Sequence, residues 1–99
     1  MNATEENGIL RVELSGRIDS GNAPQVEKEM AELAAAHPGA GVVFDANDLE
    51  YISSAGLRVL LHVRKNNPDM KIINVGSDTY EIFEVTGFSQ MISIERKTV

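Results

Sequence analysis

Apolar and polar residues alternate over residues 9–14, which is the pattern of a half-buried strand with one face on a core. The apolar positions of this strand are Leu10, Val12 and Leu14. Asn7 and Gly8 form a turn signal before it, so residues 1–6 are expected to fold back as a short edge strand. Residues 16–19 are then expected to carry the chain off the sheet.

Helical spacing of apolar residues begins near Pro24, which suits the first turn of a helix because no N–H is needed there. Asn22 is the expected N-cap residue. His37 and the Pro-Gly pair after it end the helix. The residues expected on its apolar face are Val26, Met30, Leu33 and Ala34.

A second helix is predicted over residues 54–66. It follows a continuous apolar run at residues 42–44, which predicts a strand buried on both faces, and a sharp turn at which Ser53 and Ser54 lie. The apolar face of the helix carries Leu57, Leu60 and Leu61, with Val59 and Val63 beside them. This face is wider than one contact with a sheet requires, so part of it is expected to meet another helix or a partner.

The last third of the chain predicts a strand at residues 71–75, a short helix and a final strand at residues 91–94. Residues 96–99 are expected to be a frayed tail. Ser77 or Asp78 is the expected N-cap of the short helix. Its expected inward residues are Ile82, Phe83 and Val85. Gly87 is expected to end the helix, with Phe88 folding back over the end.

Strands that alternate with helices predict an α/β fold with parallel pairing through right-handed crossovers. The chain is expected to form a single domain over residues 1–99. Loops that follow strands lie at the carboxyl ends of those strands, so Ser53 and Ser54 are expected to project from that edge of the sheet.

The composition narrows the possible functions. The chain has 15 Asp+Glu against 9 Lys+Arg, a net charge of -6, which argues against nucleic acid or an anionic membrane surface as the main partner. It has no cysteine, which excludes disulfides, zinc thiolate sites and thiol nucleophiles. The N-terminus is polar and acidic, and no apolar run approaches the ~20 residues that span a bilayer, so a cytoplasmic location is expected.

Residues of catalytic or metal-binding type are few and scattered. His62 lies about two helical turns from Ser54, ~12 Å at ~1.5 Å per residue, which is too far for a catalytic triad. His37 lies beside a Pro-Gly break and is expected to be solvated. Asp45 and Asp48 are expected to flank a strand end, where turn stabilisation is commoner than binding of a divalent ion. No enzyme activity, cofactor or metal is therefore expected.

Two adjacent hydroxyls, Ser53 and Ser54, stand at the start of the second predicted helix. A serine oxygen at such a position can accept from the free N–H groups of the first helical turn. The same N–H groups and the positive end of the helix dipole also favour a phosphate there. Ser54 can therefore be a helix cap, a phosphate acceptor or both.

The stretch Asp48–Leu57 resembles the STAS domain family, and more closely the bacterial anti-sigma factor antagonists. The family pattern is roughly Asp-Leu-x-Tyr/Phe-Ile/Met-Asp-Ser-Ser/Thr/Ala-Gly-Leu, followed by an apolar helix. Three further segments match the family, namely residues 16–19, 42–45 and 83–88. The resemblance implies the STAS fold, a small mixed sheet of about four or five strands with about three helices mainly on one face.

The resemblance also implies a function as an anti-sigma factor antagonist. Unphosphorylated members bind an anti-sigma factor that is also an ATP-dependent serine kinase, and this binding frees a sigma factor to activate transcription. A serine phosphatase reverses the phosphorylation. Ser54 matches the phosphorylated serine, with Ser53 as the second choice. The residues implied in partner binding are Asp19, Ser20, Gly21, Asn22, Ser53, Ser54, Ala55, Gly56, Leu57 and Arg58.

This chain departs from the family pattern at two places, and the first of them leaves an alternative open. Ser53 stands where the family usually has aspartate, and the chain ends at Val99 where many members continue into a further helix. The alternative is a STAS subunit that is never phosphorylated, such as a scaffold or a component of a lipid-transport or stress-signalling complex. An enzyme that uses Ser54 is the third hypothesis.

Overall fold

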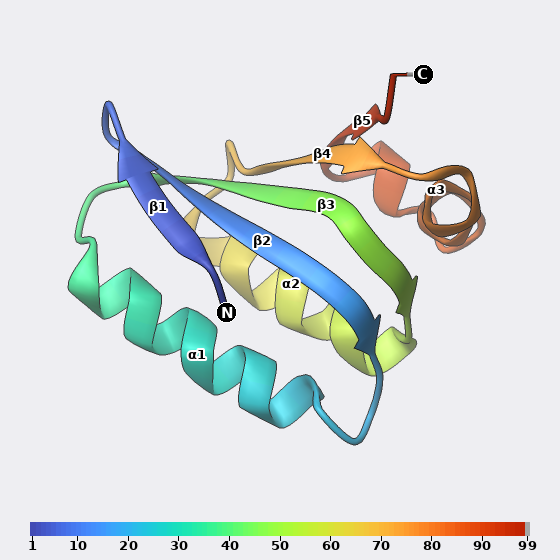
Figure 1. Cartoon of the computed structure of the whole chain (residues 1–99), viewed down its shortest axis with the longest axis horizontal. Coiled ribbons are helices and arrows are strands. Elements are labelled where there is room, and N and C mark those ends of the chain that lie inside the picture. Colours follow the sequence, from blue (N-terminus) through green and yellow to red (C-terminus); the bar gives the residue numbers. More distant parts are fainter. Residues whose placement is uncertain (99) are drawn as a thin grey trace.

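A five-stranded sheet in the order β1-β2-β3-β4-β5 forms the centre of the computed structural model (Figure 1). The structure describes residues 1–98. The elements in chain order are β1 (Ala3–Glu6), β2 (Ile9–Ile18), α1 (Ala23–Ala36), β3 (Gly41–Ile52), α2 (Ser54–Asn66), β4 (Lys71–Val75), α3 (Ser77–Val85), the 3-10 turn η1 (Phe88–Gln90) and β5 (Ser93–Arg96).

The sheet is mixed because β1 pairs antiparallel with β2, whereas the strands from β2 to β5 pair parallel. Each of the three parallel crossovers steps in the same direction along the sheet. Right-handed crossovers of this kind place their helices on the same face. Figure 1 shows α1 and α2 side by side below the strands and α3 near the end formed by β4 and β5. The predicted fold class is confirmed.

The core lies between the sheet and the helices. Leu10, Val12 and Leu14 are all buried, as the alternation of residues 9–14 predicts. Phe44 of β3 and Ile72 of β4 are fully buried beside them. The predicted boundaries of α2 and β4 are also confirmed.

The central strand was predicted too short. β3 runs over 12 residues, from Gly41 to Ile52, so Asp45 and Asp48 lie within it and do not flank its end. The prediction that residues 16–19 leave the sheet is also wrong, because β2 stays paired with β3 up to Ile18. The pairing contains register shifts near Ser15, which interrupt the alternation that would reveal a long strand.

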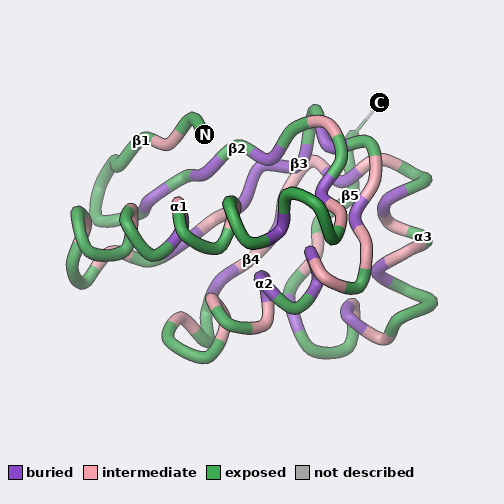
Figure 2. The backbone as a smooth tube through the Cα atoms, turned by 90° about the horizontal axis from the view of Figure 1, so that it is seen from below, coloured by how far each residue is buried: buried purple, intermediate pink, exposed green. Residues whose placement is uncertain are grey.

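Helix α1 buries a narrow stripe. Only Ala23 and Met30 are buried, while Val26 and Leu33 are half-buried. Ala34 is exposed, contrary to the prediction, and Figure 2 shows most of this helix in the colour of exposed residues. An alanine is small enough to extend an apolar pattern into solvent at little cost.

The N-cap residue of α3 is Gly76, not the predicted Ser77 or Asp78, and the helix begins at Ser77. Neither Ser77 nor Asp78 makes a capping hydrogen bond. Phe83 is fully buried, but Val85 is 81% exposed, so its predicted inward position is wrong. The reason is that α3 is short and its core face is filled by Thr79 and Phe83.

The end of α3 follows the prediction. Gly87 adopts the left-handed conformation, with φ of 82°. Phe88 folds back and is buried, with its ring centroid 6.1 Å from that of Phe83. A left-handed residue at this position, usually glycine, is a common way to end a helix.

The last strand lies two residues later than predicted, at Ser93–Arg96, because Met91 and Ile92 belong to the turn before it. The prediction of a frayed tail from residue 96 is wrong for Arg96, which belongs to β5, and for Lys97, which makes two hydrogen bonds. Lys97 donates its backbone N–H to Val75 O at 2.8 Å and its Nζ to Asn47 O at 3.0 Å. Val99 lies outside the described residues.

Among residues 1–98, no helix has both the length and the apolar character needed to cross a bilayer.

Candidate functional site

The start of α2 lies where two parallel strands end together. Ile18 of β2 pairs with Ile52 of β3, and the N–H of Ser53 donates to Ile18 O at 2.8 Å. Helix α2 begins at the next residue, Ser54. The loop after β2 and the first turn of α2 therefore lie at the same edge of the sheet, as expected for the carboxyl ends of parallel strands.

Ser53, and not Ser54, caps α2. Ser53 has an extended backbone, with φ of −90° and ψ of 175°, and its Oγ accepts from the N–H of Gly56 at 3.4 Å. Ser54 is the first residue of the helix and is exposed, and within residues 1–98 its hydroxyl forms no hydrogen bond. The residue pattern alone left Ser54 open as a helix cap, a phosphate acceptor or both. The structure separates the capping hydroxyl from the exposed one.

Gly56 lets α2 pass close to the two strands. A Cβ at this position would lie 2.7 Å from Ile52 Cγ1 and 2.8 Å from Ile18 Cγ2, both closer than carbon atoms pack. Gly56 and its neighbour Leu57 are buried. This close contact fixes where the first turn of α2 lies relative to the ends of β2 and β3.

The loop at residues 19–22 is held by its own side chains. Asp19 Oδ1 accepts from the N–H groups of Gly21 at 3.0 Å and Asn22 at 3.2 Å. Asn22 Oδ1 accepts from the N–H of Asp19 at 2.8 Å, and its Nδ2 donates to Arg17 O at 2.7 Å. Asn22 is the N-cap residue of α1 by position, as predicted, but it makes no side-chain cap because its amide closes this loop.

The residues predicted to bind a partner differ in their exposure to solvent. The residues of that set that are exposed are Ser20, Gly21, Asn22, Ser54 and Arg58, and Asp19, Ser53 and Ala55 are half-buried. Gly56 and Leu57 are buried and serve packing, so they offer little surface to a partner. The accessible part of the site combines the loop at residues 19–22 with the exposed side of the first turn of α2.

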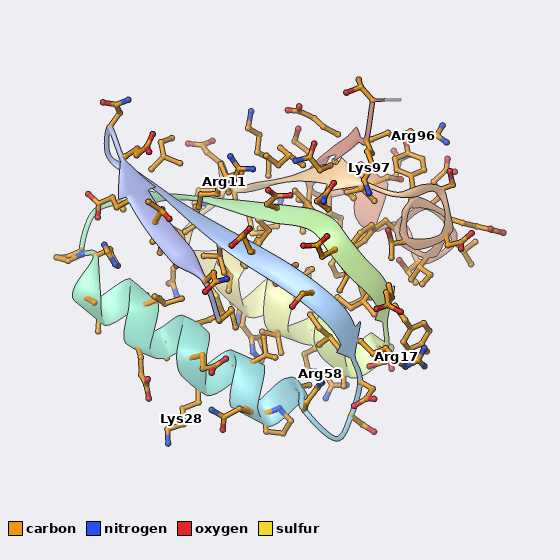
Figure 3. The ribbon with its side chains drawn as sticks, in the orientation of Figure 1. Arg11, Arg17, Lys28, Arg58, Arg96 and Lys97 are labelled. Atoms are coloured by element: carbon orange, nitrogen blue, oxygen red, sulfur yellow. The ribbon has the colours of Figure 1, made fainter. Side chains whose placement is uncertain are left out.

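Arg17 lies at the same edge of the sheet and was not among the predicted residues. Its guanidinium carbon is 4.4 Å from the ring centroid of Tyr51, with which it pairs across β2 and β3. Figure 3 shows Arg17 and Arg58 at the end of the molecule where these strands finish. The sequence carries no local sign of this contact, because Arg17 and Tyr51 are 34 positions apart in the chain. They meet only because of the register in which β2 pairs with β3.

The histidines lie away from this edge. His62 Nδ1 is 2.6 Å from Glu27 Oε1, a contact that joins α2 to α1. His37 Nδ1 is 2.6 Å from Glu5 Oε1, a contact that joins the end of α1 to β1. Neither contact involves Ser54, so within residues 1–98 the hydroxyl has no histidine base beside it.

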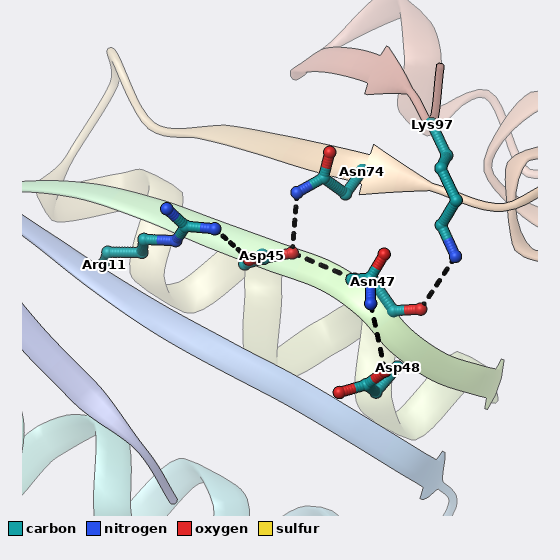
Figure 4. Close-up of polar contacts among 6 residues, drawn as sticks. All are labelled: Arg11, Asp45, Asn47, Asp48, Asn74 and Lys97. Carbon is teal, nitrogen blue, oxygen red and sulfur yellow. Dashed lines mark hydrogen bonds and ion pairs between the residues drawn. The ribbon is translucent and has the colours of Figure 1, made fainter. Parts of the chain in front are cut away.

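A second polar cluster occupies the middle of the sheet (Figure 4). Asp45 is buried and forms an ion pair with Arg11, while its Oδ1 accepts from Asn74 Nδ2 at 3.0 Å and from the N–H of Asn47 at 3.0 Å. Burial alone would raise the pKa of Asp45, but the hydrogen bonds from Arg11, Asn74 and Asn47 together lower it below its usual value. The carboxylate is fully engaged, which suits a structural role that joins β2, β3 and β4.

The sequence profile of the STAS domain family matches residues 1–99, and the chain belongs to this family. BtrV of Bordetella bronchiseptica, which is named as a candidate anti-sigma factor antagonist, is 37% identical over 93 residues, covering 89% of this chain and 78% of BtrV. The anti-sigma-B factor antagonist of Bacillus subtilis is 30% identical over 97 residues, covering 94% of this chain and 86% of that protein. The resemblance to the anti-sigma factor antagonists is confirmed.

Solved structures agree on the fold. The crystal structure of an anti-sigma factor antagonist from Mycobacterium paratuberculosis has a TM-score of 0.83 at 23% identity, covering 99% of this chain and 85% of that one. A chain from a solved structure of the stressosome, a signal integration and transduction hub, has a TM-score of 0.71 at 13% identity. The match covers 97% of this chain and 88% of that chain. At these identities the two structures show the shared fold.

Proposed function

We propose that this protein is an anti-sigma factor antagonist whose binding to an anti-sigma factor is switched by phosphorylation of Ser54. The observation that carries the proposal is the exposed Ser54 hydroxyl at the first position of α2, with no hydrogen bond among residues 1–98, in a chain whose relatives are named anti-sigma factor antagonists. The surface around it acts as a binding module, not as an enzyme.

The physical basis of the switch is a charge added to a contact surface. A phosphoryl group brings about −1.5 to −2 charges at pH 7. In free solution this charge is tolerated at a helix start, because the N–H groups and the dipole of α2 offset it. Inside an interface it must lose its water without a matching partner. A penalty on the order of 3 kcal/mol would weaken binding by roughly a hundredfold.

The partners implied by this switch are an anti-sigma factor that is also an ATP-dependent serine kinase, and a serine phosphatase. Binding of the unphosphorylated protein would withdraw the anti-sigma factor and free a sigma factor. The proposal needs no change in the fold for the partner to be released.

The binding test compares Ser54→Asp, Ser54→Ala and a matched control, Ser77→Asp. Ser77 is also exposed and is also the first residue of a helix, so the control adds the same charge in the same helical position at another place. We expect Ser54→Asp to bind the partner kinase roughly a hundredfold more weakly, and Ser54→Ala and Ser77→Asp to bind like the wild type. Equal binding by Ser54→Asp and the wild type would contradict the switch.

Mass spectrometry of the protein from its native cells, with peptide mapping, tests the site itself. A single phosphate on Ser54 is the expected result. A phosphate on Ser53 would move the site to the capping residue. If no phosphate is found during growth, starvation and stress, the second candidate is favoured, which is a STAS scaffold that is never phosphorylated. The observation that supports this candidate is that Ser53 stands in place of the usual aspartate.

A further inference from the structure

Arg58 lies one helical turn after Ser54 on the same side of α2. Residues four apart in a helix are neighbours, with Cβ atoms about 5–6 Å apart. Both residues are exposed, whereas Gly56 and Leu57 between them are buried against the sheet. The guanidinium of Arg58 is therefore within reach of a group attached to the Ser54 hydroxyl.

The Arg58 guanidinium is free to make such a contact. Within residues 1–98, no carboxylate lies at ion-pair distance from it. The other cation at this edge, Arg17, is stacked over the ring of Tyr51. The carboxylate of Asp19, at the same edge of the sheet, already accepts from two backbone N–H groups of its own loop. Arg58 is thus the cation best placed to meet a phosphate on Ser54.

We propose that Arg58 is the counter-ion of the Ser54 phosphate in the free, phosphorylated protein. This inference rests on the proposed function only in taking Ser54 as the phosphorylated residue. The planar fork of a guanidinium matches two phosphate oxygens at once, which makes arginine a better partner than a point charge. Phosphorylation then changes two exposed groups together: it adds an anion at position 54 and withdraws a free cation at position 58 from the surface offered to the partner.

The test uses the full chain with phosphoserine inserted at position 54 during translation, so that no kinase is needed. Phosphorus NMR follows the second pKa of the phosphate as the pH is varied. We compare the chain that retains Arg58 with the variants Arg58→Gln and Arg58→Lys. Lys28→Gln is the control, because Lys28 is an exposed cation on α1 and Figure 3 shows it away from Arg58.

We expect Arg58→Gln to raise the second pKa of the phosphate by roughly 0.3 to 0.7 of a unit, which is the size expected for an exposed ion pair. Arg58→Lys should raise it less, and Lys28→Gln should leave it unchanged. The difference between the chain that retains Arg58 and Arg58→Gln should shrink at about 1 M salt, where the screening length is about 3 Å. An equal pKa in Arg58→Gln, or a larger rise in an Arg17→Gln variant, would overturn the proposal.

This test is independent of the proposed function. The pKa of the phosphate is measured without any partner, whereas release by phosphorylation is measured as binding to the partner kinase. If Arg58→Gln raises the pKa of the phosphate but phosphorylation of Ser54 leaves binding to the partner kinase unchanged, the ion pair is supported and the switch is rejected. Because Arg58 is exposed, its variants should fold normally, which circular dichroism melting of the unphosphorylated proteins checks.

Discussion

Two adjacent serines with the same chemical group have different surroundings at the start of α2. The Ser53 oxygen accepts from the N–H of Gly56 at 3.4 Å, and the Ser54 hydroxyl faces solvent. The difference depends on one fact, that β3 continues to Ile52, so that the extended capping residue is number 53. The sequence indicates both serines as candidates, but a shift of one residue in the end of a strand exchanges their roles.

We predict that Ser53→Ala lowers the free energy of unfolding by about 0.5 to 1 kcal/mol, the lower part of the range for a lost cap because the hydrogen bond is long. Ser54→Ala should change it by less than about 0.5 kcal/mol, since this hydroxyl supports no contact among residues 1–98. Urea unfolding followed by circular dichroism measures both variants. A larger loss in Ser54→Ala than in Ser53→Ala would reverse the assignment of the cap.

At the scale of elements, the position of α2 depends on its close approach to β2 and β3 at Gly56. The two atoms nearest to a Cβ there belong to Ile52 and Ile18, one from each strand. Both isoleucines are buried, so neither has open space into which it can move. The glycine in the family motif therefore has a structural explanation, which is that it brings the first turn of α2 to the edge where the two strands end.

We predict that Gly56→Ala destabilises the fold by about 1 to 3 kcal/mol, because the added methyl group overpacks the contact. The matched control is Gly41→Ala, where a Cβ would meet nothing closer than 3.8 Å. That control should change the free energy of unfolding by less than about 0.5 kcal/mol. Thermal unfolding monitored by circular dichroism is the measurement, and a Gly56→Ala variant as stable as its control would refute the close contact.

A buried carboxylate joins three strands on the sheet. Asp45 of β3 binds Arg11 of β2 and Asn74 of β4, and these contacts hold its pKa below the usual value although burial alone would raise it. A carboxyl group whose pKa is lower in the folded state stabilises the fold at pH values above its unfolded pKa. This stabilisation is lost as the pH falls through the folded value.

We predict that Asp45→Asn lowers the free energy of unfolding at pH 7 by about 1.5 to 3 kcal/mol, the range for hydrogen bonds to charged groups. The difference from the wild type should stay constant from pH 7 to about 5 and shrink below about pH 4, near the unfolded pKa of an aspartate. Urea unfolding at a series of pH values measures it, with the exposed Asp48→Asn as control. A difference that does not change with pH would show that the charge of Asp45 does not contribute.

At the scale of the whole molecule, the direction of the crossovers sets the face on which the helices lie, and the parallel pairing of β2 and β3 sets the edge that carries the candidate site. The chain moves along the sheet from β2 to β5 in one direction, so right-handed connections leave the helices on one face. The loop at residues 19–22 and the start of α2 each follow one of two paired parallel strands, so they lie at the same edge, 30 or more positions apart in the chain. A partner that binds this edge meets both segments at once.

Much of this architecture could be predicted from local patterns. The spacing of Leu57, Leu60 and Leu61 predicted α2, and the alternation of Leu10, Val12 and Leu14 predicted the buried face of β2. Predictions failed where long-range pairing overrides local pattern. β3 extends through Asp48, a poor strand former, because Ser15 of β2 pairs with it. Val85 has an apolar side chain yet is exposed, because a short helix with a narrow core face leaves no room for it.

The sequence by itself determined the order of strands and helices, the helix that starts at the paired serines, and membership of the STAS family, because periodicity, turn residues and motifs are local properties of the chain. Only the tertiary structure decided that Ser53 caps α2 while Ser54 is exposed, that Asp45 joins three strands, and that Arg17 stacks on Tyr51. These contacts depend on strand length and register, which are set by backbone hydrogen bonds between segments far apart in sequence.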